Sequence, residues 1–488
     1  MCDFHMSDNL ISPQYFFFKK AVEKIKEKDI KDVIILGDIT SYGEPEGLKM
    51  VLSGLEGMNF RYVIGNSDVR NEDTRQKFID NAKDFCIKAG NRNIYGINVY
   101  DSNISSSSCE LLKKCNDGDV IVLHYSMQGL SSESRSFIEN LSNDRKLEIV
   151  HGHSHKVQNY SFGKSHVRGL LALDPDKAAG NFPTITYMDI YDDEITYEEE
   201  YIKPSLSAVE DIFNYFGISC VDNMRDLKYA TENGVGAVEL RTNVSDWVPD
   251  LSLLPEIDKW RQSGGRYLSV HMPNVRCKNG IFTGCENWML AVDYAKKIGA
   301  DGLTMHPPRV KKSELLNNAQ VWDEFLKLYV YAVKEMDGNV KIGIENLHKE
   351  PYENEKEGFC FGYVPNEVLM WINAINKELG TERVGHTLDV GHARNNGKFS
   401  QMFPVSKWYM GMGDKTVAYH IHQVVDTNSG TTNHNAIESW LGPVINYTSF
   451  LYAWEKKIIN HATVFLEVKG AENYSKSIAG FNDLRARL

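Results

Sequence analysis

Histidine, aspartate and glutamate stand at the ends of six consecutive apolar runs in the second half of the sequence. They are His271 in S-V-H-M-P, His306 in T-M-H-P-P, Glu345 in I-G-I-E-N, Asp389 in L-D-V-G-H, His420 in A-Y-H-I-H-Q and Glu467 in F-L-E-V-K. His392 follows Asp389 by three residues, and His434 lies in the segment after His420. Converging carboxylates and imidazoles destabilise one another unless cations lie among them, and these donors suit zinc, manganese or iron. The pattern predicts a metal centre.

A second ordered set of candidate ligands lies in the first half of the sequence. It comprises D-F-H (Asp3, His5), G-D (Asp38), G-N-S-D (Asn66), L-H (His124) and G-H-S-H (His153, His155). Three of these motifs follow the apolar runs 33–36, 61–64 and 120–123. Ligands on loops after adjacent strands can converge on two cations, and a carboxylate such as Asp38 can bridge them through its two oxygens. We therefore expect a second metal site here.

The elements that must position the second-half ligands follow a regular rhythm. Eight β-rich runs alternate with helical stretches, at residues 216–220, 235–240, 267–271, 302–306, 341–345, 384–389, 417–420 and 463–467. Eight strand–helix units in about 280 residues is typical of a (β/α)8 TIM barrel, and a doubly wound open sheet is the alternative. Barrel active sites form at the carboxyl ends of the strands, which is where these ligands fall.

The first half has strand-like runs of its own, and the fold class of the whole sequence is α/β. These runs lie at residues 32–36, 60–64, 120–123, 148–150, 167–173 and 185–190. Acidic residues 192–194 and 198–200 follow, and Pro204 then breaks the pattern. We place the domain boundary there, which gives domains of residues 1–204 and 205–488.

Composition is ordinary for a globular protein, with 42% hydrophobic and 25% charged residues. No apolar run approaches the roughly 18 residues that a membrane span needs, and no signal peptide is recognised, so no membrane partner is expected. The eight cysteines form no C-x-x-C pair, and we expect them to be reduced thiols of a cytoplasmic protein. The net charge of −12 gives no general support for nucleic-acid binding. The oligomeric state is left open.

The second-half motifs resemble the xylose isomerase-like TIM barrels of the sugar phosphate isomerase/epimerase superfamily. The closest resemblance is to AP endonucleases of the endonuclease IV type (AP endonuclease family 2), and it covers residues 214–488. It implies three metals at the barrel mouth. The implied ligands are His271, His306 and Glu345 for the first metal, Glu345 again with Asp389, His420 and Glu467 for the second, and His392 and His434 for the third. The family's D-x-H reads Thr432-Asn433-His434 here, and Asp426 is a candidate substitute for the aspartate.

Sugar isomerases and epimerases of the same superfamily are the main alternative. They resemble the sequence around one metal, at Glu345, Asp389, His420 and Glu467, and their two glutamates move protons on a sugar carbon. A one-metal isomerase does not need the further imidazoles of His271, His306 and His434, whereas phosphoester cleavage uses several metals. Basic residues after several of the strands also suit a phosphate-bearing substrate: Arg276, Lys278, Arg309, Lys311, Lys312, Arg394, Lys398 and Lys469.

The first-half motifs resemble the calcineurin-like metallophosphoesterases over residues 1–200, which implies an αββα sandwich. The implied ligands are Asp3, His5, Asp38 and His155 for one metal, and Asp38, Asn66, His124 and His153 for the other. Ser67 stands where many members have histidine in G-N-H-D, which resembles the family's small phosphodiesterase branch. The family's D-x-H ends a buried first strand, and only Met1 and Cys2 precede Asp3. We expect either a start further upstream or a sheet without that strand.

Together these resemblances imply a two-domain hydrolase in which metal-activated water attacks phosphoesters. The residues expected to act in catalysis are Glu345, Glu467, Asp389, Asn66 and His124. The phosphate-bearing substrate is a small molecule or a nucleic acid, and abasic DNA, a nucleotide and a phosphosugar all stay open. A non-enzymatic binding protein with inherited sites is a third hypothesis.

Two polar residues near the predicted barrel mouth are given no ligand role. His422 alternates with His420, so we expect it to face the other side of its strand. Glu239 ends the second predicted strand, and we expect it to line the pocket or to pair with Arg241.

Overall fold

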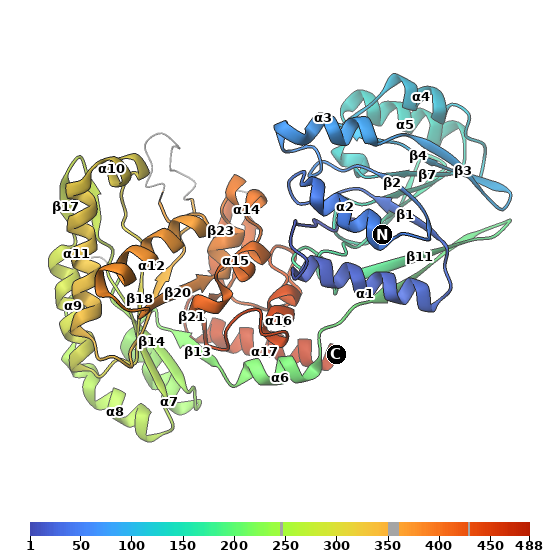
Figure 1. Cartoon of the computed structure of the whole chain (residues 1–488). Helices are drawn as coiled ribbons and strands as arrows, with labels where there is room; N and C mark the ends of the chain where they lie inside the picture. The colour runs from blue at the N-terminus through green and yellow to red at the C-terminus, as the bar shows by residue number, and fades with distance from the viewer. Residues whose placement is uncertain (245–246, 350–360, 428–429) are drawn as a thin grey trace. The chain divides into compact units, whose positions relative to one another are not determined.

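The computed structural model describes residues 1–244, 247–349, 361–427 and 430–488, and it divides into two compact units (Figure 1). The first unit is Met1–Lys203 together with Leu441–Ser449, and the second is Pro204–Trp440 with Phe450–Leu488. The predicted domains are contiguous, with residues 441–449 in the barrel, whereas the structure groups this segment with the first unit. The Asn446 side chain donates hydrogen bonds to the carbonyls of Ala178 and Asn181, each at 2.7 Å.

The second unit is built on a closed barrel of eight parallel strands, as predicted. In barrel order they are β13 (Phe216–Ser219), β14 (Ala237–Arg241), β15 (Tyr267–His271), β18 (Gly302–Met305), β19 (Lys341–Glu345), β20 (Val384–Asp389), β21 (Thr416–Ile421) and β24 (Thr463–Leu466). Strand β24 pairs with both β21 and β13, which closes the barrel without a free edge. The carboxyl ends of all eight strands therefore open toward one mouth.

Helices lie outside these strands (Figure 1). They are α6 (Leu206–Phe213), α7 (Asn223–Glu232), α8 (Leu254–Gln262), α9 (Cys285–Lys297), α10 (Lys312–Asn317), α11 (Ala319–Glu335), α12 (Pro365–Leu379), α13 (Val390–Arg394), α14 (Lys398–Met402), α15 (Val405–Met412), α16 (Thr448–Glu455) and α17 (Ala471–Arg487). Two hairpins, β16 (Arg276–Lys278) with β17 (Ile281–Thr283) and β22 (Gln423–Thr427) with β23 (Gly430–Asn435), extend from the loops after β15 and β21. Helix α11 buries Val321, Phe325 and Tyr329 at intervals of four residues, the spacing of a helix that covers a sheet.

The first unit contains a mixed six-stranded sheet, one parallel pair of strands and two antiparallel pairs. The sheet is β3 (Phe85–Ala89), β4 (Arg92–Gly96), β7 (Val120–Leu123), β8 (Glu148–His151), β10 (Ser165–Gly169) and β9 (Gln158–Phe162). The other strands are β1 (Asp32–Leu36) with β2 (Asn59–Val63), β5 (Val99–Tyr100) with β6 (Asn103–Ile104), and β11 (Thr184–Ile190) with β12 (Ile195–Tyr201). The helices are α1 (Pro13–Glu27), α2 (Pro45–Gly54), α3 (Glu72–Asn81), α4 (Ser106–Leu112) and α5 (Ser132–Asp144). These strands and helices form a domain of the predicted α/β class.

The segment that carries Asp3 runs beside β1. The Met1 amino group donates to the Ile34 carbonyl at 3.0 Å, and the Asp3 amide donates to the Gly37 carbonyl at 3.0 Å. Met6 forms a parallel bridge with Thr40. This pairing brings the D-F-H motif next to the loop that follows β1.

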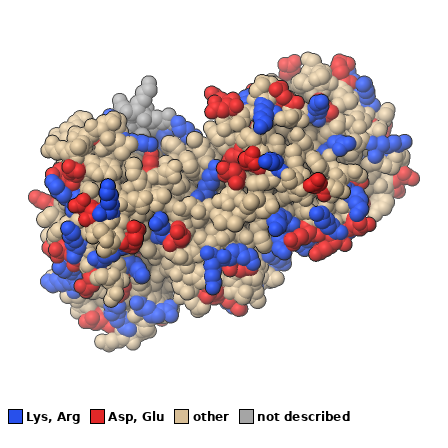
Figure 2. Space-filling view, viewed as in Figure 1, with Lys and Arg blue, Asp and Glu red and all other residues tan. Residues whose placement is uncertain are grey.

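Charges of both signs are interspersed on the face of each unit that Figure 2 shows. Among the described residues, none of the helices is long and apolar enough to cross a bilayer. The seven cysteines in these ranges are free thiols, and Cys360 lies outside them.

Asp174 and Asp176 form a buried carboxylate pair in the first unit. The Gln14 amide donates to both, at 3.0 Å each. Burial and the neighbouring Asp176 raise the pKa of Asp174 to about 7. The unfolded chain releases this proton at about pH 3.9, so the folded state loses stability as pH rises from about 4 to about 7, and the full cost is present above pH 7.

Asp174→Asn is therefore expected to stabilise the metal-free first unit, and more at pH 8 than at pH 5. The asparagine oxygen still accepts from Gln14, and Asp176 is then the one carboxylate of the pair left to bury. Each kcal/mol gained corresponds to a rise of about 2–4 °C in Tm for a domain of this size. Differential scanning calorimetry at both pH values, with a chelator present, measures the difference. An equal shift at both would rule out the titration of Asp174 as its cause.

Candidate metal centres

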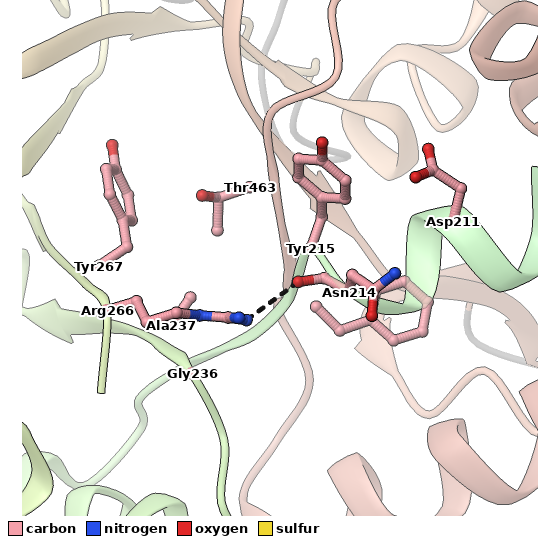
Figure 3. Close-up of a pocket in the computed structure, with 9 residues that line it drawn as sticks. Asp211, Asn214, Tyr215, Gly236, Ala237, Arg266, Tyr267 and Thr463 are labelled. Carbon is pink, nitrogen blue, oxygen red and sulfur yellow. Dashed lines mark hydrogen bonds between the residues drawn. The ribbon is translucent and has the colours of Figure 1, made fainter. Parts of the chain in front are cut away.

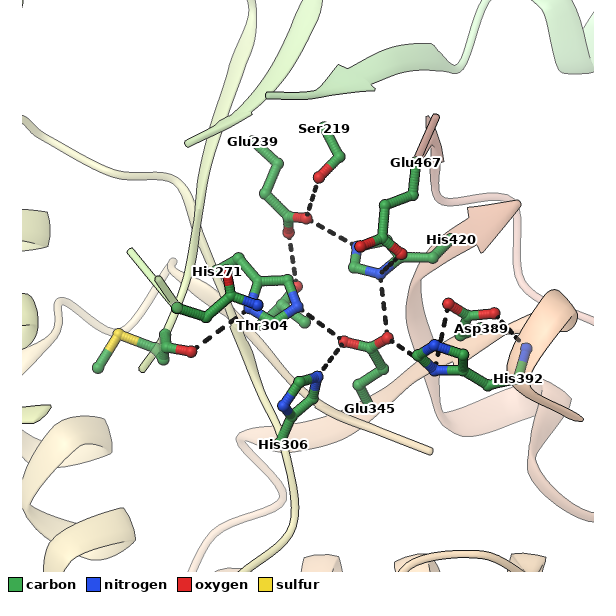
Figure 4. A network of polar contacts seen from close by, with 12 residues as sticks. Ser219, Glu239, His271, Thr304, His306, Glu345, Asp389, His392, His420 and Glu467 are labelled. Atoms are coloured by element: carbon green, nitrogen blue, oxygen red, sulfur yellow. Dashed lines mark hydrogen bonds and ion pairs between the residues drawn. The ribbon is translucent and has the colours of Figure 1, made fainter. Parts of the chain in front are cut away.

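The barrel places the predicted second-half ligands at or just beyond the carboxyl ends of six strands (Figure 4). His271, Glu345 and Asp389 end β15, β19 and β20. His420 is the next-to-last residue of β21, and His306 and Glu467 directly follow β18 and β24. All but His306, which is partly exposed, are buried. The parallel closed barrel is what makes residues so distant in sequence converge.

Glu345 lies at the centre of this cluster and uses both carboxylate oxygens. Oε2 is 3.0 Å from His271 Nε2 and 3.3 Å from His306 Nε2. Oε1 is 3.3 Å from His420 Nδ1 and 3.4 Å from His392 Nδ1. Since each oxygen faces a different set of imidazoles, this carboxylate is placed to bridge two cations.

Candidate ligand atoms fall into two groups that share Glu345, and within each group they lie within 4.8 Å of one another. The groups are His271, His306 and Glu345, and then Glu345, Asp389, His420 and Glu467. His420 Nδ1 is 3.3 Å from Glu467 Oε2. These are the sets that the resemblance implies for two adjacent metals.

A third group consists of His392, His422 and His434. The expectation that His422 faces away from the cluster is wrong, because His422 Nε2 lies 3.3 Å from Asp389 Oδ1. Strand β21 ends at Ile421, so the alternation of a strand does not extend to His422. The side chain of Asp426 lies outside the described residues.

Glu239 is a polar contact of the cluster to which the sequence prediction gave no definite partner. Its Oε2 lies 2.8 Å from His420 Nε2, and its carboxylate accepts hydrogen bonds from Ser219, Ser269 and Thr304 (Figure 4). The alternative of a pair with Arg241 is not found, since Arg241 donates to Asn243 instead. Hydroxyl residues within the predicted strands are the signal that could have marked Glu239 as a buried acceptor, once the neighbouring strands are known.

Glu239 holds the His420 ring so that Nδ1 points at Glu345 and Glu467. Glu239→Gln is expected to weaken metal affinity by about 10–100-fold, the usual cost of losing a carboxylate behind a ligand histidine. Zinc competition with a chromogenic chelator gives the affinity. Glu367→Gln, a buried carboxylate paired with Lys312 away from the cluster, is the control. If Glu239→Gln and wild type bind zinc with equal affinity, Glu239 does not orient His420 for metal binding.

Several buried atoms of the cluster make no hydrogen bond within the described ranges: Glu345 Oε1, Asp389 Oδ2, His420 Nδ1 and Glu467 Oε2. Each buried polar atom without a hydrogen-bond partner lowers the stability of the folded state by about 1–3 kcal/mol. Divalent cations would satisfy them, and a donor set of imidazole nitrogen and carboxylate oxygen fits zinc, manganese or iron.

Burial and neighbouring charges give these side chains very different pKa values. Burial lowers the pKa of His306 to about 4 against the pull of Glu345. Burial acts in the same direction on His392, but Asp389 and Glu345 outweigh it and raise its pKa to about 10. Burial acts to raise the pKa of Glu345, yet His420 and His306 hold it well below its usual range. A cation that enters this cluster displaces imidazole protons, so metal binding releases acid.

Asp38 lies at the centre of the first unit's cluster. Its Oδ1 is 3.4 Å from His124 Nε2 and its Oδ2 is 3.7 Å from His5 Nε2. Asp3 Oδ1 lies 3.3 Å from His155 Nε2, and the ligand atoms of Asp3, His5, Asp38 and His155 are within 4.8 Å of one another. This group is the predicted first metal set of the domain.

The predicted second set lies on the other side of Asp38. Asn66 Oδ1 is 3.1 Å from His124 Nε2 and 2.8 Å from His153 Nδ1, and these two nitrogens are 3.2 Å apart. Burial and the nearby His124 lower the pKa of His153 to about 4. A neutral imidazole with a free lone pair is the form that binds a metal.

The backbone is strained where it presents these ligands. Asp3, His5, Asp38, His153 and His155 all have φ between 45° and 64°. Such left-handed residues cost about 1–3 kcal/mol each and cluster at functional sites. The strain indicates that the fold maintains this arrangement for a purpose other than stability.

Glycines of the motifs leave room for ligands of other motifs. A Cβ on Gly65 would lie 2.2 Å from Asp38 Oδ1, and one on Gly152 would lie 2.8 Å from Asp3 Oδ2. Ser67, which follows Asn66 in the G-N-S-D motif, donates its hydroxyl to the Thr40 carbonyl at 2.8 Å, and its amide donates to Asp38 at 2.8 Å. Ser67 therefore supports Asp38 and supplies no imidazole.

A separate cavity of about 380 Å³ lies at the opposite end of the barrel (Figure 3). Its lining includes Tyr267 and Thr463, the first residues of β15 and β24, and Arg266. The side chain of Arg266 donates to the Asn214 carbonyl at 3.1 Å. Because barrel chemistry is carried by the carboxyl ends of the strands, this cavity is not part of the metal cluster.

Both units match known families. The family model of the xylose isomerase-like TIM barrel matches residues 227–484, and that of the calcineurin-like phosphoesterase superfamily domain matches residues 1–188. No curated protein matches the sequence.

Solved structures with similar folds cover 56% of the chain. One is a D-tagatose 3-epimerase-like protein, with 17% identity, 97% of its own length covered and a TM-score of 0.41. Endonuclease IV from Thermus thermophilus has 15% identity, 100% coverage and a TM-score of 0.39. D-Allulose 3-epimerase from Methylomonas sp. has 15% identity, 94% coverage and a TM-score of 0.37.

Proposed function

The chain belongs to the xylose isomerase-like TIM barrel family and carries a calcineurin-like phosphoesterase domain ahead of the barrel, and we propose that both units hydrolyse phosphoesters with bound divalent metals. The observation that carries the proposal for the barrel is the placement of Glu345 between two sets of ligands. A one-metal centre does not require such a carboxylate. Paired metals in phosphoesterases stabilise both the attacking and the leaving oxygen of an in-line displacement.

The barrel's side chains have distinct roles in this proposal. Glu345 would be a ligand at both cation positions, and Asp389, His420 and Glu467 would complete the second one, where the carboxylates would neutralise its charge. His271 and His306 lie on the Oε2 side of Glu345 and complete the first position. Basic residues on the strand-end loops attract the phosphate of the substrate, although Lys312 is paired with Glu367 at 2.7 Å.

In the first unit, Asp38 takes the position that Glu345 has in the barrel. Asn66 and His124 hold the second cation position and face the substrate phosphate. With Ser67 in place of histidine, no imidazole at that position assists the leaving group. A phosphodiester with a good leaving group is therefore a better substrate for this unit than an alkyl monoester.

A sugar isomerase or epimerase barrel is the second candidate. Glu345 and Glu467 both approach His420 Nδ1 at 3.3 Å, so two carboxylates flank one position, as an acid–base pair on a sugar carbon requires. This reaction predicts exchange of a substrate C–H proton with solvent, and phosphoester hydrolysis does not.

Metal content together with a substrate screen tests the proposal. Two hydrolytic centres predict about four or five metals per chain, and an isomerase barrel predicts about three. The screen comprises phosphomonoesters, phosphodiesters, abasic DNA and, in deuterium oxide, ketoses. Ketose C–H exchange without phosphoester cleavage by the barrel would overturn the hydrolase proposal, and a metal-free preparation would overturn both candidates.

A further inference from the structure

We propose that His422 is a metal ligand and that it joins His392 and His434 as the third imidazole of a third cation site. The inference rests on the proposed function in one respect, namely that cations occupy the adjacent pair around Glu345. The family resemblance assigns His392 and His434 to this position and nothing to His422. The structure places the missing donor on the segment directly after β21.

The three rings converge from three separate elements. His392 lies in α13, His422 directly follows β21, and His434 lies in β23. Their ligand nitrogens are within 4.8 Å of one another, and the ring centroids of His422 and His434 are 4.4 Å apart. His392 and His422 are buried, and His434 is half-buried. Three buried or half-buried imidazoles this close are stable when a cation shares their lone pairs.

Gly391 provides the space for the His422 ring. A Cβ at Gly391 would lie 2.0 Å from His422 Cε1 and 2.2 Å from Nε2. Glycine inside a helix is about 1 kcal/mol less favourable than alanine, so α13 loses helix stability to keep this space. This close approach indicates that Gly391, the residue before His392, keeps the His422 ring in position.

The position of the ring proton decides which role His422 has. The His434 amide donates to Nδ1 at 3.0 Å, so the ring proton lies on Nε2, which is 3.3 Å from Asp389 Oδ1. A cation that binds Nε2 would displace this proton to Nδ1. Nδ1 would then donate to the Gln423 carbonyl, which lies 3.2 Å away. Without a cation, His422 would orient its neighbours and bind no metal.

A site with three imidazole donors has a definite preference among metal ions. Nitrogen donors suit zinc, iron and copper, whereas manganese and magnesium prefer the oxygen donors that the pair around Glu345 supplies. His434 also has a left-handed backbone, with φ of 58°, which holds its ring toward the other two. The third position should therefore accept zinc and reject manganese, while the pair accepts both.

Zinc content of purified variants tests the assignment. His422→Phe keeps a ring of similar size without a donor atom, and Gly391→Ala displaces the ring while leaving His422 in the sequence. Each is expected to lose about one zinc per chain relative to wild type, with the remaining zinc unchanged. His461→Phe, a histidine stacked on Trp454 outside the cluster, is the matched control and should keep all zinc. In manganese alone, wild type and His422→Phe should bind equal amounts.

His422→Gln separates the ligand role from an orienting role. Glutamine can accept from the His434 amide and donate to Asp389, but it is a poor zinc ligand. Loss of one zinc in this variant supports the proposal, and full retention overturns it. X-ray absorption of the zinc protein gives an independent count, since the proposal requires more nitrogen neighbours per zinc in wild type than in His422→Gln. A wild-type barrel that binds no zinc would instead overturn the proposed function, because every site would then be lost together.

Discussion

Glu345→Gln is expected to lower the barrel's turnover by about a thousandfold and to release the cations on both sides of this residue. Both carboxylate oxygens lie within 3.4 Å of imidazole ligands, and an amide cannot bridge two cations. Removing one partner from a buried charge cluster costs about 3–5 kcal/mol, and about 4 kcal/mol corresponds to a thousandfold in rate. Metal content and turnover of the best substrate from the screen are the two measurements.

A surface carboxylate gives the control for this variant. Glu335→Gln removes an exposed ion pair with Lys296 on the outside of α11, which is worth at most about 1 kcal/mol. It should keep full metal content and turnover. Circular dichroism checks that Glu345→Gln is folded. If Glu345→Gln turns over substrate at the wild-type rate with a full complement of metal, Glu345 does not bridge cations.

The barrel was predictable because its strands are short apolar runs that end at a ligand. The predicted bounds 267–271, 341–345 and 384–389 coincide with β15, β19 and β20. Parallel barrel strands are buried on both faces and read as continuous apolar segments, and His271, Glu345 and Asp389 mark where each one reaches the mouth. The periodicity thus predicts both the element and the position of its functional residue.

Features that depend on long-range contacts were not predictable. Residues 198–200 read as an acidic run, yet they lie within β12, where Lys24 pairs with Glu200 and Lys28 pairs with Glu198. Neighbours so far away in sequence decide whether a glutamate-rich segment is a loop or a strand. The grouping of residues 441–449 with the first unit has the same cause.

His422, whose direction was wrongly predicted, and Glu239, for which two alternatives were left open, show a subtler limit. The direction of the His422 side chain could be predicted only if β21 was known to end at Ile421. The ends of strands and helices are the least certain part of a sequence prediction. The hydrogen-bond partners of Glu239 could be predicted only from the order of strands in the barrel. Two of them, Ser269 and Thr304, come from β15 and from the next strand in barrel order, β18.

Asp38→Asn is expected to abolish phosphodiester cleavage by the first unit and to leave the barrel intact. The side chain of Asp38 lies between His124 and His5, and an amide in its place loses the charge that holds two cations together. Folding should survive, because asparagine also tolerates the left-handed backbone at φ of 49° and keeps an oxygen that accepts from the Ser67 amide. Hydrolysis of bis(p-nitrophenyl) phosphate should fall about a thousandfold, as for Glu345.

Comparison of Asp38→Asn with Glu345→Gln assigns each activity to one unit. Each variant should lose about two cations, and each should keep the activity that the other one loses, since neither residue lies in the other's cluster. Asp101→Asn is the matched control for the first unit, because Asp101 is an exposed partner of Arg75 with a left-handed backbone like that of Asp38. Retention of full phosphodiester cleavage by Asp38→Asn, with its loss in Glu345→Gln, would mean that the first unit is catalytically silent and that the barrel alone performs the hydrolysis.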